Sequence, residues 1–279
     1  MNIGFIGAGK VGFSLGKYLK EHGASISGYM SRSEESAFEA SRFTDSGFFG
    51  SYAEIVGESD VIFVSVPDGQ IENICQDLKK EEMSGKIICH LSGAKTSAVF
   101  DALREDGAYG YSVHPFLAIS DRYESWKSFS EAVFTVEGDE ARMEDITGIL
   151  RSIGNRVTVI DASKKVLYHT AASIASNFMV TLLDVSEEML KRVGFSKDDL
   201  SIALTPLVML NIKSALEKGP EASLTGPIER GDVDTVLAHL GAVNDEEKEL
   251  YKVLALRTIR LAQKKHHDRD YLRIEEALK

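Results

Sequence analysis

The chain has 279 residues, of which 43% are hydrophobic and 27% are charged, and its formal net charge is −11. This composition is ordinary for a soluble, enzyme-sized protein with one large domain or two moderate ones. The acidic balance argues against non-specific attachment to nucleic acid or to an anionic membrane surface. A local basic pocket for a small anion stays compatible with it.

Targeting signals are not evident. No uninterrupted apolar run approaches the roughly 18 residues of a membrane-spanning helix. The first residues, MNIGFIGAG, carry neither a basic leader nor a cleavage site. Cys75 and Cys89 are the only cysteines, which suits a reducing compartment and offers no metal-ligand spacing. We therefore expect a cytoplasmic protein with no bound metal, no membrane and no nucleic-acid partner.

A glycine-rich turn follows the first apolar run. NIGFI (2–6) is typical of a short strand, and GAGKVG (7–12) follows it at once. A helical pattern then runs to a glycine, and SISGYM (25–30) is typical of a second strand. A lone GxGxxG is a weak signal, but its place between strand and helix in a βαβ unit favours dinucleotide binding. A glycine-rich turn without a ligand is the alternative.

Each glycine has a distinct role in such a turn. Gly7 allows the tight turn, Gly9 lets the backbone approach a pyrophosphate, and Gly12 lets the helix pack close to the strand. The amide protons at the helix N-terminus then face the phosphates. We expect the whole loop to bind the cofactor: Gly7, Ala8, Gly9, Lys10, Val11 and Gly12.

The end of the second predicted strand bears on the choice of nucleotide. An NAD site places an Asp or Glu about 20 residues beyond the glycines, where it holds the ribose 2′-hydroxyl. Here Ser31, Arg32 and Ser33 occupy that region instead. Because a guanidinium can bind phosphate through two hydrogen bonds, this triplet favours NADP over NAD. Alternatively, Arg32 is only a solvated loop residue.

Further strands are predicted to end at the same edge of a parallel sheet, where open α/β sheets bind ligands. The run 60–68 passes through Val66 and Pro67, and the run 86–94 ends at Ser92 and Gly93. Small residues there would let a nicotinamide ring lie against the backbone, although ordinary loop chemistry explains Ser92 equally well. The run 108–116 is expected to place His114 and Pro115 just past a strand, and 132–138 and 156–161 complete the predicted strands.

Beyond Asp161 the strand pattern ends and one long helix, 164–194, is predicted. At 100° per residue, the side chains of Lys165, His169, Ser173 and Ser176 share one stripe, with Asn177 at its edge. Because polar groups on a buried helix need partners, the stripe indicates a ligand-lined surface or hydrogen bonds between packed helices.

The remaining chain is predicted to be helical except for LTGPIERGD (224–232). Pro206 should kink or divide the helix 198–219, and helices 233–241 and 246–265 follow. Arg230, between two glycines, suits a substrate carboxylate or phosphate, whereas N-capping explains Asp232 equally well. His266 and His267 are expected to be solvated. The predicted substrate-binding residues in this segment are Thr225, Gly226, Arg230 and Asp232.

These motifs resemble a predicted-oxidoreductase family that joins a Rossmann-like NADP domain to a helical domain of unknown function, the DUF2520 type. The resemblance rests on the glycine loop, VPD, the HP pair, YHTAASIASN and TGPIERGD. It implies an α/β fold with a doubly wound, mostly parallel sheet in residues 1–161 and an all-α domain in residues 162–279. It also implies a homodimer formed through the helical domain.

More distantly, the layout is similar to the 6-phosphogluconate, β-hydroxyacid, ketopantoate and pyrroline-5-carboxylate reductase group. β-Hydroxyacid dehydrogenases carry a Lys on this helix with an Asn one turn later. Here the stripe has His169, Ser173 and then Asn177 two turns on, with Lys165 one turn earlier. The HP pair is similar to that of prephenate dehydrogenases, but the rest of their signature is absent, so a prephenate substrate is not implied.

The sequence thus predicts an NADP-dependent oxidoreductase for a small, anionic carbonyl, imine or hydroxyl compound held between the two domains. His169 is the first choice for general acid/base and His114 the second. Ser173 and Asn177 would orient the reacting oxygen, and Arg230 would bind the substrate's anion. A non-catalytic NADP sensor and a deazaflavin-dependent NADP reductase are the alternatives. The substrate and the direction of hydride transfer stay open.

Overall fold

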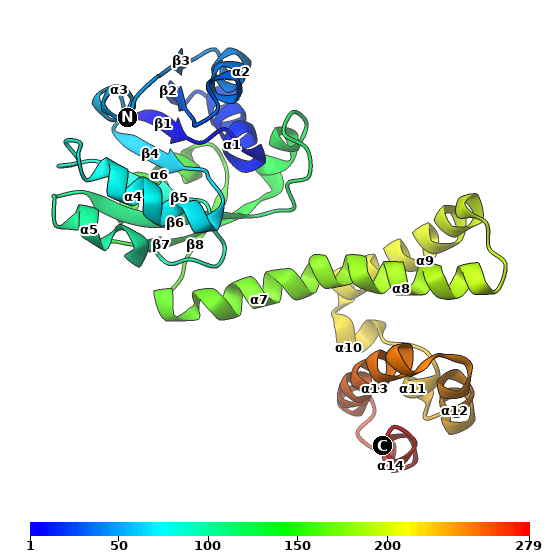
Figure 1. Cartoon of the computed structure of the whole chain (residues 1–279). Coiled ribbons are helices and arrows are strands. Elements are labelled where there is room, and N and C mark those ends of the chain that lie inside the picture. The colour runs from blue at the N-terminus through cyan, green and yellow to red at the C-terminus, as the bar shows by residue number, and fades with distance from the viewer. The chain divides into compact units, whose positions relative to one another are not determined.

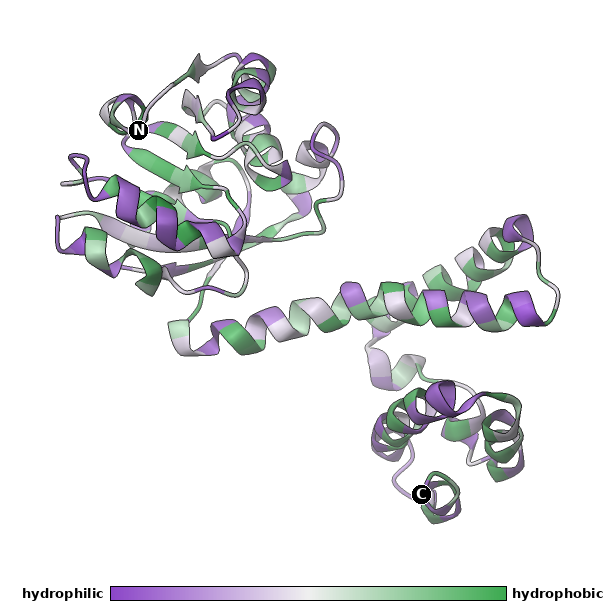
Figure 2. Cartoon of the chain, viewed as in Figure 1, coloured by the Kyte–Doolittle hydropathy of each residue, from purple (hydrophilic) through white to green (hydrophobic).

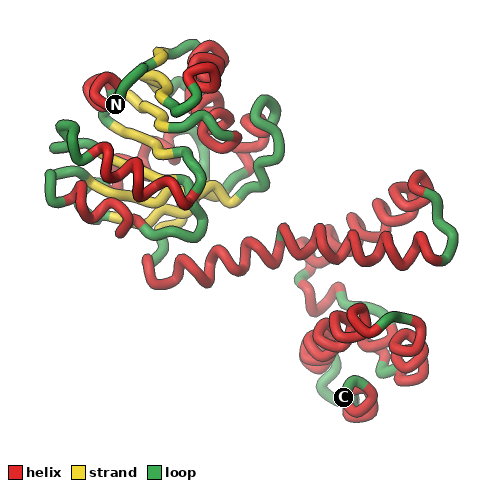
Figure 3. The backbone as a smooth tube through the Cα atoms, viewed as in Figure 1, coloured by secondary structure: helices red, strands yellow, loops and turns green.

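The computed structural model describes residues 1–279, and the chain forms two compact units, Met1–Phe178 and Met179–Lys279. All strands lie in the first unit (Figure 3). The division falls within the long helical stretch, whereas the predicted domain boundary follows Asp161, before that stretch begins.

The first unit is built on one eight-stranded sheet with the order β3-β2-β1-β4-β5-β6-β7-β8 (Figure 1). Every neighbouring pair is parallel except β6 and β7, which are antiparallel. The predicted α/β class with a mostly parallel sheet is confirmed. The strands are β1 Asn2–Ile6, β2 Ser25–Met30, β3 Gly47–Phe48, β4 Val61–Val64, β5 Ile87–His90, β6 Tyr109–Phe116, β7 Val133–Gly138 and β8 Arg156–Val159.

Helices cover both faces of this sheet, because alternate residues of its apolar strands point to opposite sides. Phe5 and Phe63 join a core that includes side chains of α1 and α2, while Ile6 and Val64 join one that includes side chains of α3 and α4. The inner strands accordingly appear hydrophobic in Figure 2. The helices are α1 Lys10–Glu21, α2 Glu34–Thr44, α3 Tyr52–Glu58, α4 Ile71–Leu78, α5 Asp101–Arg104, α6 Met143–Ser152 and α7 Lys165–Ala175.

The seven predicted strands are present, with one addition and one correction. β3 has only two residues, which is too short for an alternating pattern to be recognised. His114 and Pro115 lie within β6 rather than past its end. The antiparallel pairing with β7 extends to the pair Phe116–Val133 and so prolongs β6 through both residues.

The predicted long helix 164–194 is interrupted at Ser176, which separates α7 from α8 (Asn177–Arg192). The Ser176 hydroxyl donates to the carbonyl of Ala172 at 2.8 Å, a bond that competes with regular helix geometry. Pro206, by contrast, lies inside an unbroken helix, α9. The other helices are α9 Lys197–Lys218, α10 Pro220–Ser223, α11 Pro227–Arg230, α12 Val233–Ala242, α13 Asp245–Lys265 and α14 Leu272–Ala277.

The core of the second unit comes from α12, α13 and α14, with Val236, Ile259 and Ile274 nearly fully buried. Helix α8 contributes no buried residue and α9 contributes only Leu200. Both helices therefore carry large apolar side chains that nothing in this unit covers.

By length and mean hydropathy, Ala162–Arg192 and Lys197–Lys218 could each cross a membrane. Neither segment is an uninterrupted apolar run, which is the pattern that was not found in the sequence. Hydropathy averaged over a window tolerates isolated polar residues such as those of the stripe. The test does not distinguish a lipid environment from a protein partner.

Candidate functional site

The glycine-rich loop presents unpaired amide groups at the start of α1. Gly9 is the N-cap residue, no side chain caps the helix, and its first turn contains no acidic residue. The first amide protons of a helix lack intrahelical acceptors and carry partial positive charge. This terminus is therefore suited to bind an anion such as a pyrophosphate.

The three glycines of the fingerprint differ in what surrounds them. A Cβ on Gly7 would lie 2.3 Å from the carbonyl oxygen of Ser65, and the φ of Gly7 is +96°. A Cβ on Gly12 would lie 2.4 Å from the Ser65 hydroxyl oxygen, whereas one on Gly9 would make only an ordinary contact at 3.7 Å. Gly7 and Gly12 are thus required by packing. Only a ligand close to the backbone would require the third glycine.

A cavity of about 770 Å³ extends from this loop. The predicted triplet Ser31, Arg32 and Ser33 lines it. The Arg32 side chain is exposed and has no hydrogen-bond or ion-pair partner. Ser33 also caps α2, since its hydroxyl accepts from the Ser36 amide. Sequence reasoning did not select the polar residues Tyr52, Gln70, Asn73 and Asp77 of its wall. The predicted cofactor residues that line it are Gly7, Ala8, Gly9, Ser31, Arg32, Ser33, Val66 and Pro67.

A second cavity, of about 270 Å³, shares Gly9, Val66 and Pro67 with the first and also includes Lys10, Val11 and Ser92. The Ser92 hydroxyl donates to Asp68 at 2.7 Å and accepts from the amides of Ala94 and Lys95. Ser92 therefore holds the turn after β5. Asp68, which follows the VP pair, was not selected from sequence because a single acid after a strand is common.

Gly93 separates this second cavity from two imidazoles. A Cβ on Gly93 would lie 2.5 Å from Nδ1 of His169 and 2.9 Å from Nε2 of His114. The two rings are nearly perpendicular, with centroids 6.2 Å apart. Residues predicted separately on a turn, a strand and a helix thus converge at one point, and only glycine leaves room for both rings.

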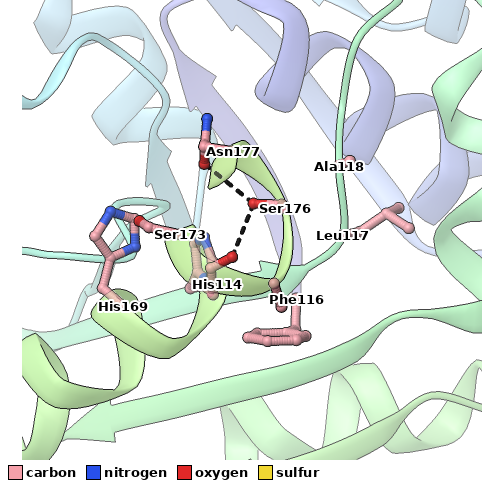
Figure 4. Close-up of a pocket in the computed structure, with 10 residues that line it drawn as sticks. His114, Phe116, Leu117, Ala118, His169, Ser173, Ser176 and Asn177 are labelled. Atoms are coloured by element: carbon pink, nitrogen blue, oxygen red, sulfur yellow. Dashed lines mark hydrogen bonds between the residues drawn. The ribbon is translucent and has the colours of Figure 1, made fainter. Parts of the chain in front are cut away.

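A third cavity, of about 220 Å³, is lined by both imidazoles (Figure 4). His169, Ser173 and Asn177 of the predicted stripe line it, together with His114 and Ser176. Its apolar wall consists of Phe116, Leu117, Ala118, Ala172 and Ala175. The structure therefore brings together all four predicted catalytic residues at one pocket of the first unit.

His114 is held in the neutral state. Its Nδ1 is hydrogen-bonded to the hydroxyl of Tyr168 at 2.7 Å. Burial, and then the Lys165 ammonium, lowers the pKa of His114 to about 4. At neutral pH this imidazole can therefore exchange hydrogen bonds but carries no charge.

His169 has one buried nitrogen, Nδ1, without a hydrogen-bond partner. A buried N–H group without an acceptor is rarer in proteins than an unused acceptor. We therefore place the ring proton on Nε2, leaving a lone pair on Nδ1 against Gly93.

Two further groups at this site, Lys165 and Tyr168, were missed as functional candidates. Lys165 is buried and donates to Ser112 Oγ at 2.5 Å, and Tyr168 contacts His114. Lys165 belonged to the predicted stripe, so its angular position was available from the sequence. Tyr168 lies beside the stripe and gave no polar signal of its own.

The predicted substrate residues of the second unit lie together in the segment 224–232. Asp232 caps α12, since its carboxylate accepts from the Thr235 amide and hydroxyl. Glu229 accepts from His266, so the expectation that His266 is solvated was wrong, whereas His267 is exposed. The Arg230 side chain is exposed and makes no hydrogen bond or ion pair, Thr225 is also exposed, and Gly226, with a φ of +106°, is the N-cap residue of α11. Their role as a substrate site stays a prediction.

The sheet order, the glycine loop at α1 and the cavities at the carboxyl ends of β1, β4 and β5 define a Rossmann-like dinucleotide-binding protein with an added helical domain. A Rossmann-like domain model matches residues 1–115, and the model of DUF2520, a domain of unknown function, matches residues 132–258. The chain therefore joins these two kinds of domain, as its motifs predicted.

Relatives of known description agree with this assignment. A pyrroline-5-carboxylate reductase from Treponema pallidum is 24% identical over 205 residues, 71% of this chain and 75% of that protein. A structure from Bacteroides fragilis, provisionally described as an NADP oxidoreductase, is 25% identical with a TM-score of 0.72, covering 92% and 97% of the two chains. A reductive aminase from Aspergillus terreus, in complex with NADPH, shares the fold at 15% identity and a TM-score of 0.66, covering 100% and 99%.

The buried histidines predict acid sensitivity. Burial lowers the pKa of both His90 and His114 from 6.5 to about 4. Between these values the unfolded chain binds protons that the folded chain does not, so stability should fall as the pH drops from 6.5 to 4, by on the order of 1 kcal/mol per pKa unit displaced. The free energy of unfolding, measured with urea at several pH values in this range, should depend less steeply on pH for His114→Gln than for the wild type. The control His267→Gln, at an exposed position, should keep the pH dependence of the wild type. Identical slopes in all three proteins would contradict the assignment.

Proposed function

We propose that the protein is an NADP-dependent reductase that transfers hydride to a carbonyl or imine carbon and supplies the accompanying proton from a histidine. The observation that carries this proposal is the convergence of His114 and His169 on Gly93, next to the loop that suits a dinucleotide. Bound NADPH would supply the hydride. The relatives described as reductases support the reaction class.

The chain's own residues fit this cofactor. The uncapped start of α1 and the open Cβ position of Gly9 provide amides for a pyrophosphate. Arg32, exposed at the wall of the largest cavity, has its donors available for a 2′-phosphate. No acidic residue occupies positions 31–33, where a ribose 2′-hydroxyl would need one. These features favour NADP over NAD.

The two histidines are assigned different tasks. Because His114 stays neutral at physiological pH, it is suited to orient the reacting group by hydrogen bonding, with Tyr168 fixing its ring. His169 is then the general acid: its imidazolium form delivers the Nε2 proton as the substrate's oxygen or nitrogen gains charge, and the neutral ring remains. Ser173 and Asn177 line the same pocket and would orient that atom.

The pocket constrains the substrate. Its wall in the first unit is largely apolar and contains no Lys or Arg side chain. The substrate's reacting end is therefore expected to be uncharged or cationic, with an apolar neighbour. If the substrate also carries an anionic group, Arg230 of the second unit is the predicted partner for it.

Replacement of His169 tests the assignment of the proton donor. His169→Asn should lower turnover by about 10²–10⁴-fold, since it removes the transferable proton. The affinity for NADPH should change little, because His169 lies outside the nucleotide cavities. Turnover would be measured by NADPH oxidation with cyclic imines and small ketones, with His22→Asn, an exposed histidine of the same unit, as the control. Unchanged turnover in His169→Asn would exclude His169 as the proton donor. A wild-type protein that binds NADPH but oxidises none would instead indicate a non-catalytic sensor.

Replacement of Arg32 tests the choice of cofactor. Arg32→Gln should weaken NADPH binding by about 10- to 100-fold, the usual effect of losing hydrogen bonds to a charged group. NADH binding should stay the same, because NADH has no 2′-phosphate. Fluorescence titration with both nucleotides would measure this, with Arg42→Gln on the helix that follows Arg32, α2, as the control. An equal loss for both nucleotides would contradict the proposed contact.

We also propose that the chain forms a homodimer through its second unit. Helices α8 and α9 bury almost none of their own residues, and Leu207 and Leu210 on α9 are 62% and 67% exposed. Large exposed apolar surfaces of this kind mark an interaction surface. A second copy of the chain is the proposed occupant, as the family resemblance implies.

Replacement of two exposed leucines on α9 by glutamate should dissociate the proposed dimer into single chains. Light scattering after gel filtration should give twice the mass of one chain for the wild type and a single chain's mass for Leu207→Glu with Leu210→Glu. Lys213→Glu, at an exposed polar position of the same helix, should leave the dimer intact. A monomeric wild type, or a chain recovered only with membranes, would contradict the proposal.

A further inference from the structure

Lys165 is buried in a way that its helix does not otherwise explain. Its side chain is 0% exposed, while the apolar Val166 and Leu167 beside it are 70% and 69% exposed. It is the only buried residue of α7. Within the first unit, α7 therefore turns a cation inward and apolar side chains outward, which reverses the usual arrangement of an amphipathic helix.

The buried ammonium has little compensation. Its one hydrogen bond is to Ser112 Oγ, which in turn donates to the carbonyl of Ser92 at 3.3 Å. Glu137 and Asp68 attract it without forming an ion pair, and its Nζ lies 5.9 Å from the centroid of the Tyr168 ring. A buried cation of this kind is unfavourable for stability compared with an apolar side chain of similar volume. Stability therefore does not account for its presence.

The contacts of Lys165 and Tyr168 form a regular pattern. Lys165 contacts Ser112 and Tyr168 contacts His114. Ser112 and His114 are alternate residues of β6 and share one face of the strand, while Lys165, Tyr168 and His169 share one face of α7. Two polar contacts thus join α7 to β6, and His169 projects from the same turn of α7 toward Gly93.

We propose that Lys165 is a positioning residue of the proposed reductase site: its contact with Ser112 fixes α7 on β6 so that Tyr168 and His169 meet His114. Because Lys165 is fully buried, it acts through these residues and not on the substrate. The proposal rests on the proposed function for its effect on turnover, while its effect on the histidines is independent of any reaction.

The charge of Lys165 also reaches the histidines. The titratable groups that face it are Asp68, His90 from β5, His114 from β6, Glu137 from β7 and Tyr168 from α7 itself. Burial lowers the pKa of Lys165 to about 8, so it is charged at neutral pH and loses its proton in mild alkali. In its charged form it lowers the pKa of His114. Removal of the charge should therefore be detectable at that ring.

Lys165→Met tests the proposal, because methionine keeps an unbranched chain without the charge. Turnover should fall by about 100-fold, the cost of a small misplacement of catalytic groups, while NADPH affinity stays within about 3-fold. In ¹⁵N-histidine spectra the pKa of His114 should rise by about one unit, and the His169 resonances should shift. Lys164→Met, which alters the exposed neighbouring lysine, should change neither readout.

The outcomes separate this proposal from the proposed function. Wild-type turnover and unchanged histidine spectra in a folded Lys165→Met variant would overturn it. If the wild type reduces no substrate, the proposed reaction fails, and the histidine spectra alone decide on Lys165. If Lys165→Met does not fold, Ser112→Ala, which removes only the acceptor, replaces it: displaced His114 and His169 resonances support the proposal, and unchanged ones overturn it.

Discussion

The arrangement of the site depends on how closely three turns approach one another at the carboxyl edge of the sheet. The carbonyl and hydroxyl oxygens of Ser65, after β4, fill the space in which Gly7 and Gly12 would carry a side chain. Two imidazoles fill the corresponding space at Gly93, after β5. Because glycine leaves these points free for neighbouring atoms, the start of α1 packs against the turn after β4 and the histidine pair packs against the turn after β5. A side chain at any of the three glycines would separate them.

The fold could be predicted from the sequence largely because its strands are buried on both faces. Runs such as VIFV and IICH leave no alternative to the interior of a parallel sheet, and the glycine loop fixes where the first helix begins. The antiparallel return of β7 carried no such signal, and it lengthened β6 through His114. The break at Ser176, whose hydroxyl donates to the carbonyl of Ala172, is not revealed by helical periodicity.

The candidate site was predictable in part, because helical periodicity shows which side chains share a face. Periodicity placed Lys165, His169 and Ser173 on one face of a helix, but it does not say which side chains of that face reach the sheet and which line a cavity. The structure distinguishes these side chains by their burial. Lys165 is fully buried against Ser112 of β6, whereas His169 and Ser173 line the pocket. In the segment 224–232 the structure likewise assigns structural roles to two of the charged residues. Asp232 caps α12, and Glu229 binds His266, which follows α13. The Arg230 side chain is exposed and makes no ion pair, although its charge helps to lower the pKa of Asp232.

Two histidines in one site are useful only if their environments differ, since identical imidazoles would titrate together and perform the same task. Burial keeps His114 neutral, and the Lys165 charge acts in the same direction, so the ring that is bound to Tyr168 is confined to hydrogen bonding. His169 lies one helical turn after Lys165 on the same face of α7, and its unpaired nitrogen lies against Gly93 rather than against a fixed donor. In the proposed arrangement, one buried cation holds α7, and with it His169, against β6 and adds to the burial that keeps His114 neutral.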